Sequence, residues 1–168
     1  MGPGSKAVSI LSIVLCLSLF TTPIAADSKS NLDTINQQKP AGGRDLEKEV
    51  YDQLVQSLDA WNRHDIDGFL ECFWHSDDLV VVVDGENVRG WDLLSKAYHT
   101  GYPNPEEMCK LTIDRAQVQM LAPDLGFVLA WYTASFPKKK EFGTSTIILR
   151  KLSEGWRIVI SHTSFVEP

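Results

Sequence analysis

The stretch GWRIVISHTSF, residues 155–165, decides the fold because it alternates like a β-strand without having a plainly polar face. One side carries Trp156, Ile158, Ile160 and His162, and the other carries Arg157, Val159, Ser161, Thr163 and Phe165. A strand with one solvated face normally shows a clear polar set. We therefore expect both faces of this strand to be covered.

Three further strand-like runs precede it, at residues 109–121, 126–136 and 141–152. The short segments APDL, PKKK and SEG separate the four runs. Connections this short join neighbouring antiparallel strands. The second half of the chain is thus predicted to be an antiparallel meander.

Helical patterns dominate the first half of the domain. Apolar residues recur at spacings of three and four along one helical stripe, at Leu46, Val50, Leu54, Leu58 and Trp61. Residues 65–74 predict a second, short helix, residues 79–90 a hairpin that turns at Asp84-Gly85, and residues 91–102 a third helix. Helices followed by strands are typical of the α+β class.

The N-terminus has the pattern of a secretory signal peptide. Lys6 is followed by a 14-residue apolar run, residues 7–20, and then by small residues suited to cleavage. We predict a signal peptide at residues 1–26, a flexible polar leader at 27–44 and one domain at 45–168, with an uncleaved anchor helix as the alternative. The protein is then exported, to the periplasm or the medium.

Composition argues against several classes of partner. Cleavage removes one of 16 basic residues and none of 22 acidic ones, which leaves a net charge of −7. An acidic chain without a basic cluster is not suited to nucleic acid. No spacing of His and Cys predicts a metal site, and we expect no cofactor. Cys72 and Cys109 are expected to be buried thiols, with a disulfide as the alternative.

The apolar sides of the last three strands predict a dimer. Leaving rows of Trp, Ile and Leu in water costs several kcal/mol at about 25 cal/mol per Å². We expect a second copy of the chain to cover an interface formed by Phe127, Leu129, Trp131, Ile147, Leu149, Trp156, Ile158 and Ile160.

Several segments are similar to the nuclear transport factor 2-like superfamily, in its small SnoaL-like branch, and to the association domain of calcium/calmodulin-dependent kinase. They are AWNRHDIDGFLECFWHSDDLVVV (60–82), VRGWDLL (88–94), PDLGFVLAWYTA (123–134) and EGWRIVISHTS (154–164). The resemblance spans residues 47–165. It implies a cone-shaped curved antiparallel sheet, with N-terminal helices on its concave face around a pocket and dimers through its convex face.

The catalytic sets of these relatives are missing. The resemblance places the base, acid and tyrosine of ketosteroid isomerase at Val83, Thr146 and Ser57. The kinase association domain has pocket arginines where this chain has Tyr132, Thr146 and Thr163. Neither isomerase chemistry of that type nor a strong anion clamp is implied.

On the resemblance, the pocket is lined by rings and hydroxyls: Trp61, Phe69, Tyr132, Thr144, Thr146, Ser161 and Thr163. These hydroxyls could equally be ordinary strand residues. His162, Tyr132 and Asp84 are weak candidates for acid/base catalysis. Strand alternation places His162 on the interface side, unless a β-bulge reverses the alternation. Asp84 is expected to be a turn residue.

We expect an exported dimer that binds a small organic ligand in a mostly apolar pocket. The alternatives are a metal-independent isomerase, dehydratase or cyclase acting on a hydrophobic molecule, and an assembly domain with a vestigial pocket.

Overall fold

The computed structural model describes residues 41–166, beginning with the long helix α2 (Ala41–Asn62). Its apolar stripe is buried at Val50, Leu54, Leu58 and Trp61, which confirms the predicted helical face. The helix begins at Ala41, four residues before the predicted domain start at Asp45. The predicted signal peptide and most of the predicted leader lie outside the described residues.

A left-handed residue separates α2 from the next helix. His64 has φ of 60°, and Asp65 then caps the short helix α3 (Ile66–Leu70) by accepting a hydrogen bond from Gly68 N at 2.8 Å. Such a cap satisfies one of the amide groups that a helix start leaves unpaired. α3 buries Ile66, Phe69 and Leu70, so the chain turns back onto α2.

The predicted hairpin follows, with β1 (Val80–Val83) and β2 (Glu86–Arg89). Its two-residue turn has positive φ at both positions, 49° at Asp84 and 88° at Gly85, as a type I′ turn requires. Helix α4 (Trp91–Gly101) and a 3-10 turn, η1 (Pro105–Glu107), lead to the long strands.

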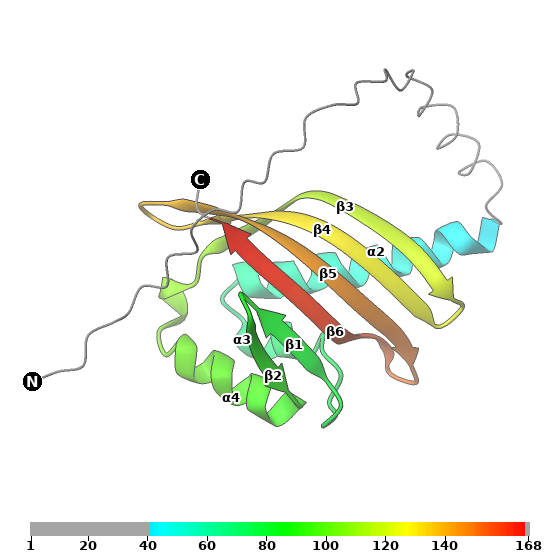
Figure 1. Ribbon diagram of the computed structural model, residues 1–168, viewed down its shortest axis with the longest axis horizontal. Helices are drawn as coiled ribbons and strands as arrows, with labels where there is room; N and C mark the ends of the chain where they lie inside the picture. The colour runs from blue at the N-terminus through cyan, green and yellow to red at the C-terminus, as the bar shows by residue number, and fades with distance from the viewer. Residues whose placement is uncertain (1–40, 167–168) are drawn as a thin grey trace, which may run out of the picture. The chain divides into compact units, whose positions relative to one another are not determined.

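The long strands are β3 (Lys110–Ala122), β4 (Leu125–Ser135), β5 (Lys140–Leu152) and β6 (Gly155–Val166). They pair consecutively and antiparallel, and β1 joins the sheet by pairing parallel with β6. The order β2-β1-β6-β5-β4-β3 gives a curved, unclosed sheet (Figure 1). The predicted α+β class and meander are confirmed.

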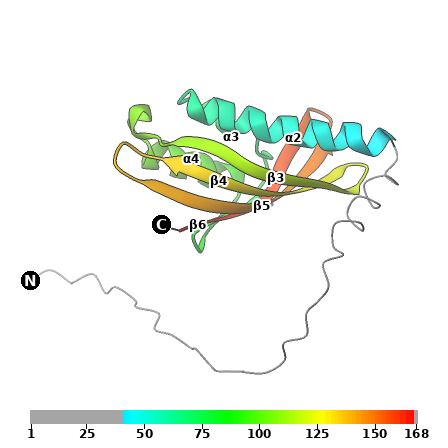
Figure 2. The same ribbon diagram turned by 90° about the horizontal axis from the view of Figure 1, so that it is seen from above.

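Helix α2 lies along one face of the sheet, which we call the inner face (Figure 2). A Cβ at Gly126 would meet Val50 of α2 at 2.7 Å, so this position of β4 points at the helix. Because side chains alternate, Val128, Ala130 and Tyr132 are also inner, and all three are buried.

The register extends the inner face across β5. Val128 pairs with Ile147 and Ala130 with Ser145, and residues directly opposite each other share a face. Ile147, Ser145 and Leu149 are therefore buried beneath the helices, whereas Thr144 and Thr146 are exposed on the opposite, outer face. The predicted faces of β5 were wrong: Ile147 and Leu149 do not belong to a convex interface, nor Thr144 and Thr146 to a pocket.

A β-bulge divides β6. Leu149 pairs with Ile158 and Ile148 with Ile160, so Val159 is an extra residue on β6. A bulge of this kind reverses the parity of the residues that follow. Trp156 and Ile158 are inner and buried, while Ile160 and His162 are outer. The predicted interface role of Trp156 and Ile158 was therefore wrong as well.

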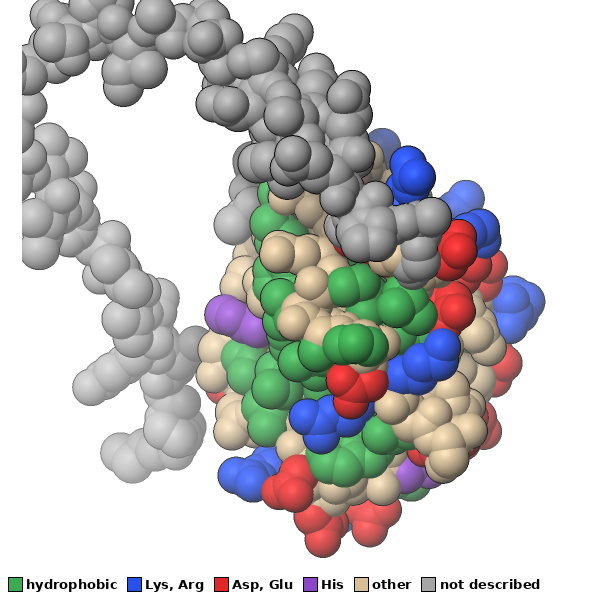
Figure 3. Space-filling model, turned by 90° about the vertical axis from the view of Figure 1, so that its right-hand side faces the viewer, with side chains coloured by type: hydrophobic (Ala, Val, Ile, Leu, Met, Phe, Trp, Pro, Cys, Tyr) green, Lys and Arg blue, Asp and Glu red, His purple; other side chains and the backbone are tan. Residues whose placement is uncertain are grey.

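Four of the eight predicted interface residues remain on the outer face. Phe127, Leu129 and Trp131 are half-buried there, and Ile160 is 46 % exposed. In Figure 3 this face forms the left margin, where hydrophobic and uncharged side chains gather, while charged side chains lie mainly toward the side of α2.

No helix in the described part of the chain is long and apolar enough to cross a bilayer.

Candidate functional site

A cavity of about 300 Å³ lies between the inner face of the sheet and the helices. Its floor comes from β1 and from β3 to β6, and its walls come from α2, α3 and α4. Most of its lining is apolar or aromatic, with a few hydroxyl groups and two carboxylates. The apolar body of the lining includes Leu54, Leu58, Phe73, Val81, Ile147 and Ile158. This composition is typical of a small-molecule pocket.

Three hydroxyl groups meet on the floor of the cavity. Ser145 Oγ and Thr163 Oγ1 are 2.6 Å apart on the paired strands β5 and β6. Burial raises the pKa of the Tyr132 phenol, and a hydrogen bond from Ser145 offsets part of that rise. Tyr132 is thus held neutral, and the group can both donate and accept hydrogen bonds.

Aromatic rings form the wall opposite these hydroxyls. The Trp61 ring packs edge-to-face with Phe69 and Tyr102, at centroid distances of 5.2 and 5.1 Å. Its Nε1 donates to Cys109 O at 2.7 Å, which fixes the indole in place. Burial also raises the pKa of Tyr98, a neighbour on α4 whose ring packs against Trp61 and Phe69.

The carboxylates Asp84 and Glu141 also line the cavity, at the end where the β1–β2 turn and the start of β5 approach the end of β6. Asp84 Oδ1 accepts a hydrogen bond from Phe165 N at 2.7 Å, and Asp84 N donates to Thr163 O at 2.9 Å. Glu141 forms an ion pair with Lys139. Together with Phe136 and Phe165, these carboxylates form what we call the rim.

Five of the seven predicted pocket residues line this cavity: Trp61, Phe69, Tyr132, Ser161 and Thr163. Whether they contact a ligand stays a prediction. Thr144 and Thr146 do not line it, for the reason of register given above. Ile147 and Ile158, predicted for the interface, line it instead.

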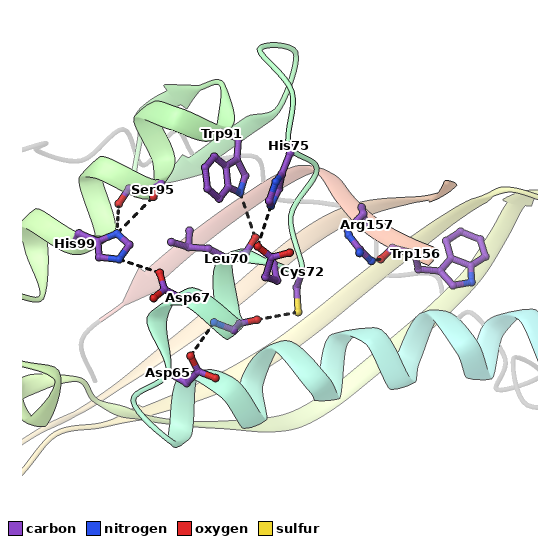
Figure 4. Close-up of polar contacts among 12 residues, drawn as sticks. Asp65, Asp67, Leu70, Cys72, His75, Trp91, Ser95, His99, Trp156 and Arg157 are labelled. Atoms are coloured by element: carbon purple, nitrogen blue, oxygen red, sulfur yellow. Dashed lines mark hydrogen bonds and ion pairs between the residues drawn. The ribbon is translucent and has the colours of Figure 1, made fainter. Parts of the chain in front are cut away.

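The histidines lie away from the cavity. His162 is exposed on the outer face, the side on which strand alternation placed it, so this weak catalytic candidate does not line the cavity. His99 Nε2 lies 3.1 Å from Asp67 Oδ1 and its Nδ1 2.8 Å from Ser95 O (Figure 4). His75 lies 3.5 Å from Glu71, and its ring packs against that of Trp91 at a tilt. Of the three catalytic candidates named from the sequence, Tyr132 and Asp84 line the cavity.

Sequence reasoning missed the contribution of α4 and of three of the four rim residues. Tyr98 and Tyr102 both line the cavity, and their spacing of four residues would have placed them on one side of a helix. Phe165 follows Ser161 and Thr163 in alternation and could have been found the same way. Glu141 and Phe136 carry no local signal, because their positions depend on the length of the β4–β5 connection.

The cysteines form no disulfide with each other, and the described residues form no metal-binding group. Cys72 and Cys109 are buried free thiols, as predicted, and burial raises the pKa of both. Among the described residues, no group of three or more His, Cys, Asp or Glu side chains is placed to hold a metal ion.

Comparison with known proteins places this geometry in a family. The model of the SnoaL-like domain matches residues 50–168. No curated protein matches the chain.

Solved structures of similar shape carry little functional information. An NTF2-like protein of unknown function from Shewanella oneidensis MR-1 is 27 % identical, with a TM-score of 0.64, over 70 % of this chain and 97 % of that one. A cystatin-like fold protein from Burkholderia xenovorans LB400 is 21 % identical, with a TM-score of 0.62, over 74 % and 94 % of the two chains. A nuclear transport factor 2 (NTF2-like) superfamily protein from Salmonella enterica serovar Typhimurium LT2 is 16 % identical, with a TM-score of 0.61, over 74 % and 92 %. At 21 % and 16 % identity, the similarity to the last two structures shows a shared fold only. With the family model matching most of its length, the chain belongs to the SnoaL-like domain family of the NTF2-like superfamily.

Proposed function

We propose that this protein is an exported carrier or receptor for a small, largely apolar organic molecule, bound without a metal in the cavity beneath α2. The observation that carries the proposal is the cavity itself, with its apolar walls and three linked hydroxyls on one side. An apolar body can be buried against the walls, while Ser145, Thr163 and Tyr132 orient one polar group of the ligand.

Binding is favoured over catalysis by the state of the rim carboxylates. Asp84 accepts a hydrogen bond from Phe165 N with one of its two oxygens, Glu141 is paired with Lys139, and the cavity tyrosines have raised pKa values. General acid/base chemistry needs a group that exchanges a proton near neutral pH within reach of the substrate. A vestigial pocket is disfavoured because the space is open rather than filled by side chains.

The second candidate is an isomerase, dehydratase or cyclase in which Asp84 is the base and Tyr132 the acid. The observation in its favour is that both side chains line one cavity. An Asp84→Asn variant separates the two functions. Loss of turnover of a bound compound with its affinity retained would support the enzyme, whereas a bound compound that wild-type protein leaves unchanged supports the carrier.

The first test is native mass spectrometry of the purified protein, which should detect a co-purified small molecule. The second is a matched pair of variants measured against that molecule. Thr163→Val removes an inner hydroxyl and should weaken binding by about threefold to tenfold, the worth of one hydrogen bond. Thr146→Val removes an outer hydroxyl and should leave affinity unchanged. Equal effects of the two variants would contradict the proposed site.

The outer face is proposed to join two copies of the chain. Its half-buried and exposed apolar residues, Phe127, Leu129, Trp131, Ile148 and Ile160, form a row flanked by neutral hydroxyls on β5. The row itself carries no charged side chain, although the Arg115 guanidinium lies over Trp131, and such a row can pack on its own copy around a two-fold axis. In sedimentation velocity the wild type should be a dimer and Ile160→Glu a monomer. Leu121→Glu, at an exposed apolar position near the β3–β4 turn, is the matched control and should remain dimeric.

Export remains a proposal that rests on the apolar run and small residues of the N-terminus. Intact mass of the protein recovered outside the cytoplasm should correspond to a chain starting at Asp27 or nearby. Recovery of the full-length mass from the membrane fraction would support the anchor helix instead.

A further inference from the structure

The cavity has an unusual charge composition. None of the described residues that line it is Lys, Arg or His, while two of them, Asp84 and Glu141, are carboxylates. A ligand anion at the rim would meet like charge and would receive no compensating cation from the lining. Burying an uncompensated charge is costly, so the lining disfavours carboxylates and phosphates.

The polar groups of the floor are unevenly placed along the cavity. The register places Val81, Ser161 and Ile147 in one row, and Val83, Thr163 and Ser145 in the next. Phe165 and Gly143 follow in a third row beside Tyr132, and Glu141 lies beyond it. The floor thus carries hydroxyl groups in its first two rows and carboxylates at the rim. A ligand that matches it has an apolar body and a polar or cationic end.

The walls are suited to the same kind of ligand. Eight aromatic side chains line the cavity: Trp61, Phe69, Phe73, Tyr98, Tyr102, Tyr132, Phe136 and Phe165. The faces of aromatic rings attract cations, and aromatic enclosures are a common way to bind alkylated ammonium groups. The lining therefore combines rings with carboxylates, and none of the described residues that line the cavity is a cation.

The protein already places an ammonium group on this rim. Lys139 Nζ lies 5.2 Å from the centroid of the Phe136 ring and pairs with Glu141. One ring and one carboxylate of the cavity lining thus already contact a cation of the protein. Lys139 compensates the charge of Glu141, so Asp84 is the carboxylate left for a ligand.

Asp84 is held in a fixed position for this role. The left-handed turn conformation and the hydrogen bonds to Phe165 N and Thr163 O tie it to the end of β6. The one hydrogen bond that the described residues donate to this carboxylate uses Oδ1. Because this bond already restrains the side chain, less conformational entropy is lost when the carboxylate pairs with a cation.

We propose that the cavity selects small organic cations: amines or alkylammonium compounds whose apolar body lies against the aromatic walls and whose charged nitrogen lies at the rim beside Asp84. This inference rests on the proposed binding function and narrows it to one class of ligand.

The test uses three probes with the same body and different ends: phenylbutylamine, phenylbutanol and phenylbutyrate. Isothermal titration calorimetry of the wild-type protein at neutral pH should rank the amine first, the alcohol second and the carboxylate last. The advantage of the amine over the alcohol should be about tenfold at low salt, the combined worth of one cation–π contact and one partly exposed ion pair. That advantage should shrink as salt is added.

Asp84→Asn keeps the shape, the turn preference and an acceptor for Phe165 N while removing the charge. It should reduce the ratio of amine to alcohol affinity to about threefold or less, the share that cation–π contacts supply. Glu86→Gln removes an exposed charge from the adjoining strand β2, outside the cavity, and should leave the ratio at the wild-type value.

The outcomes separate this inference from the function on which it rests. Alcohol binding without preference for the amine, or tighter binding of the carboxylate, leaves the carrier function intact and overturns the selection of cations. A ratio that falls equally in Asp84→Asn and Glu86→Gln overturns the role of Asp84. Failure of all three probes to bind overturns both the carrier function for ligands of this size and the inference.

Discussion

Trp156 Nε1 donates a hydrogen bond of 2.9 Å to Glu49 Oε2, and this bond connects strand β6 to helix α2. The same carboxylate oxygen accepts from Lys151 Nζ at 2.7 Å, across the β5–β6 turn. The contact lies at the end of the sheet opposite the cavity rim. It therefore holds α2 on the inner face independently of any ligand.

The first prediction concerns acid stability. The hydrogen bond from Lys151, and then that from Trp156, lower the pKa of Glu49 below its usual value of 4.5. A carboxyl whose pKa is lowered by folding stabilises the protein above its unfolded-state pKa, and this stabilisation is lost as the pH falls through the folded-state value. Glu49→Gln should therefore lower the urea midpoint at pH 7 and leave it unchanged well below pH 4.5. A difference from wild type that is the same at both pH values would contradict the role of the charge.

The second prediction contrasts two tryptophans. Trp156 is 5 % exposed on the inner face, whereas Trp131 is half-buried on the outer face beneath the Arg115 guanidinium. Trp156→Ala should lower the free energy of unfolding by about 3–5 kcal/mol, the usual cost of emptying a core position. Trp131→Ala should cost about 1 kcal/mol in the monomer and act mainly on self-association. Urea unfolding and sedimentation velocity measure the two effects, and a Trp156→Ala protein as stable as wild type would contradict the assigned faces.

The order and type of the elements could be predicted because each has a local cause. The stripe from Val50 to Trp61 repeats with helical spacing, and Asp84-Gly85 has the residues that a type I′ turn requires. These signals need no knowledge of the partner strands. They were sufficient for the α+β class and the antiparallel meander.

The faces of β5 and β6 could not be predicted in the same way. Both sides of β5 carry β-branched residues, so hydrophobicity alone did not show that Ile147 is inner and Thr146 outer. The extra residue Val159 then reverses the second half of β6, and nothing in its chemistry marks it as a bulge. The cavity depends in turn on how α4 packs, which brings Tyr98 and Tyr102 onto Trp61 through tertiary contacts only.

The third prediction concerns alkaline titration. Burial raises the pKa of Tyr98, Tyr102 and Tyr132, whereas Tyr51 is 38 % exposed on α2. A group whose folded-state pKa is raised contributes stability below its unfolded-state pKa, here about 10, and that contribution is lost as the pH rises further. Ultraviolet titration should show Tyr98, Tyr102 and Tyr132 ionising only as the fold is lost. Three or four tyrosines ionising together near pH 10 with the fold intact would contradict burial of the cavity phenols.

The fourth prediction concerns the packing of Phe165 over Gly143 at the rim. A Cβ at Gly143 would lie 2.6 Å from Phe165 Cε1, closer than real Cβ contacts allow. Gly143→Ala should therefore displace the ring and cost about 1 kcal/mol of stability.

In a Phe165→Ala background the clash is absent, and alanine is preferred over glycine in a strand by about 0.5–1 kcal/mol. The same substitution should then stabilise the protein, so the sign of its effect reverses. A double-mutant cycle measured by urea unfolding gives this coupling directly. Gly126→Ala, which meets Val50 at 2.7 Å instead, is the matched control and should cost the same in both backgrounds because Val50 lies on α2, away from Phe165. If Gly143→Ala is equally costly with and without Phe165, the strain lies in the strand itself and the aromatic ring does not close this side of the cavity.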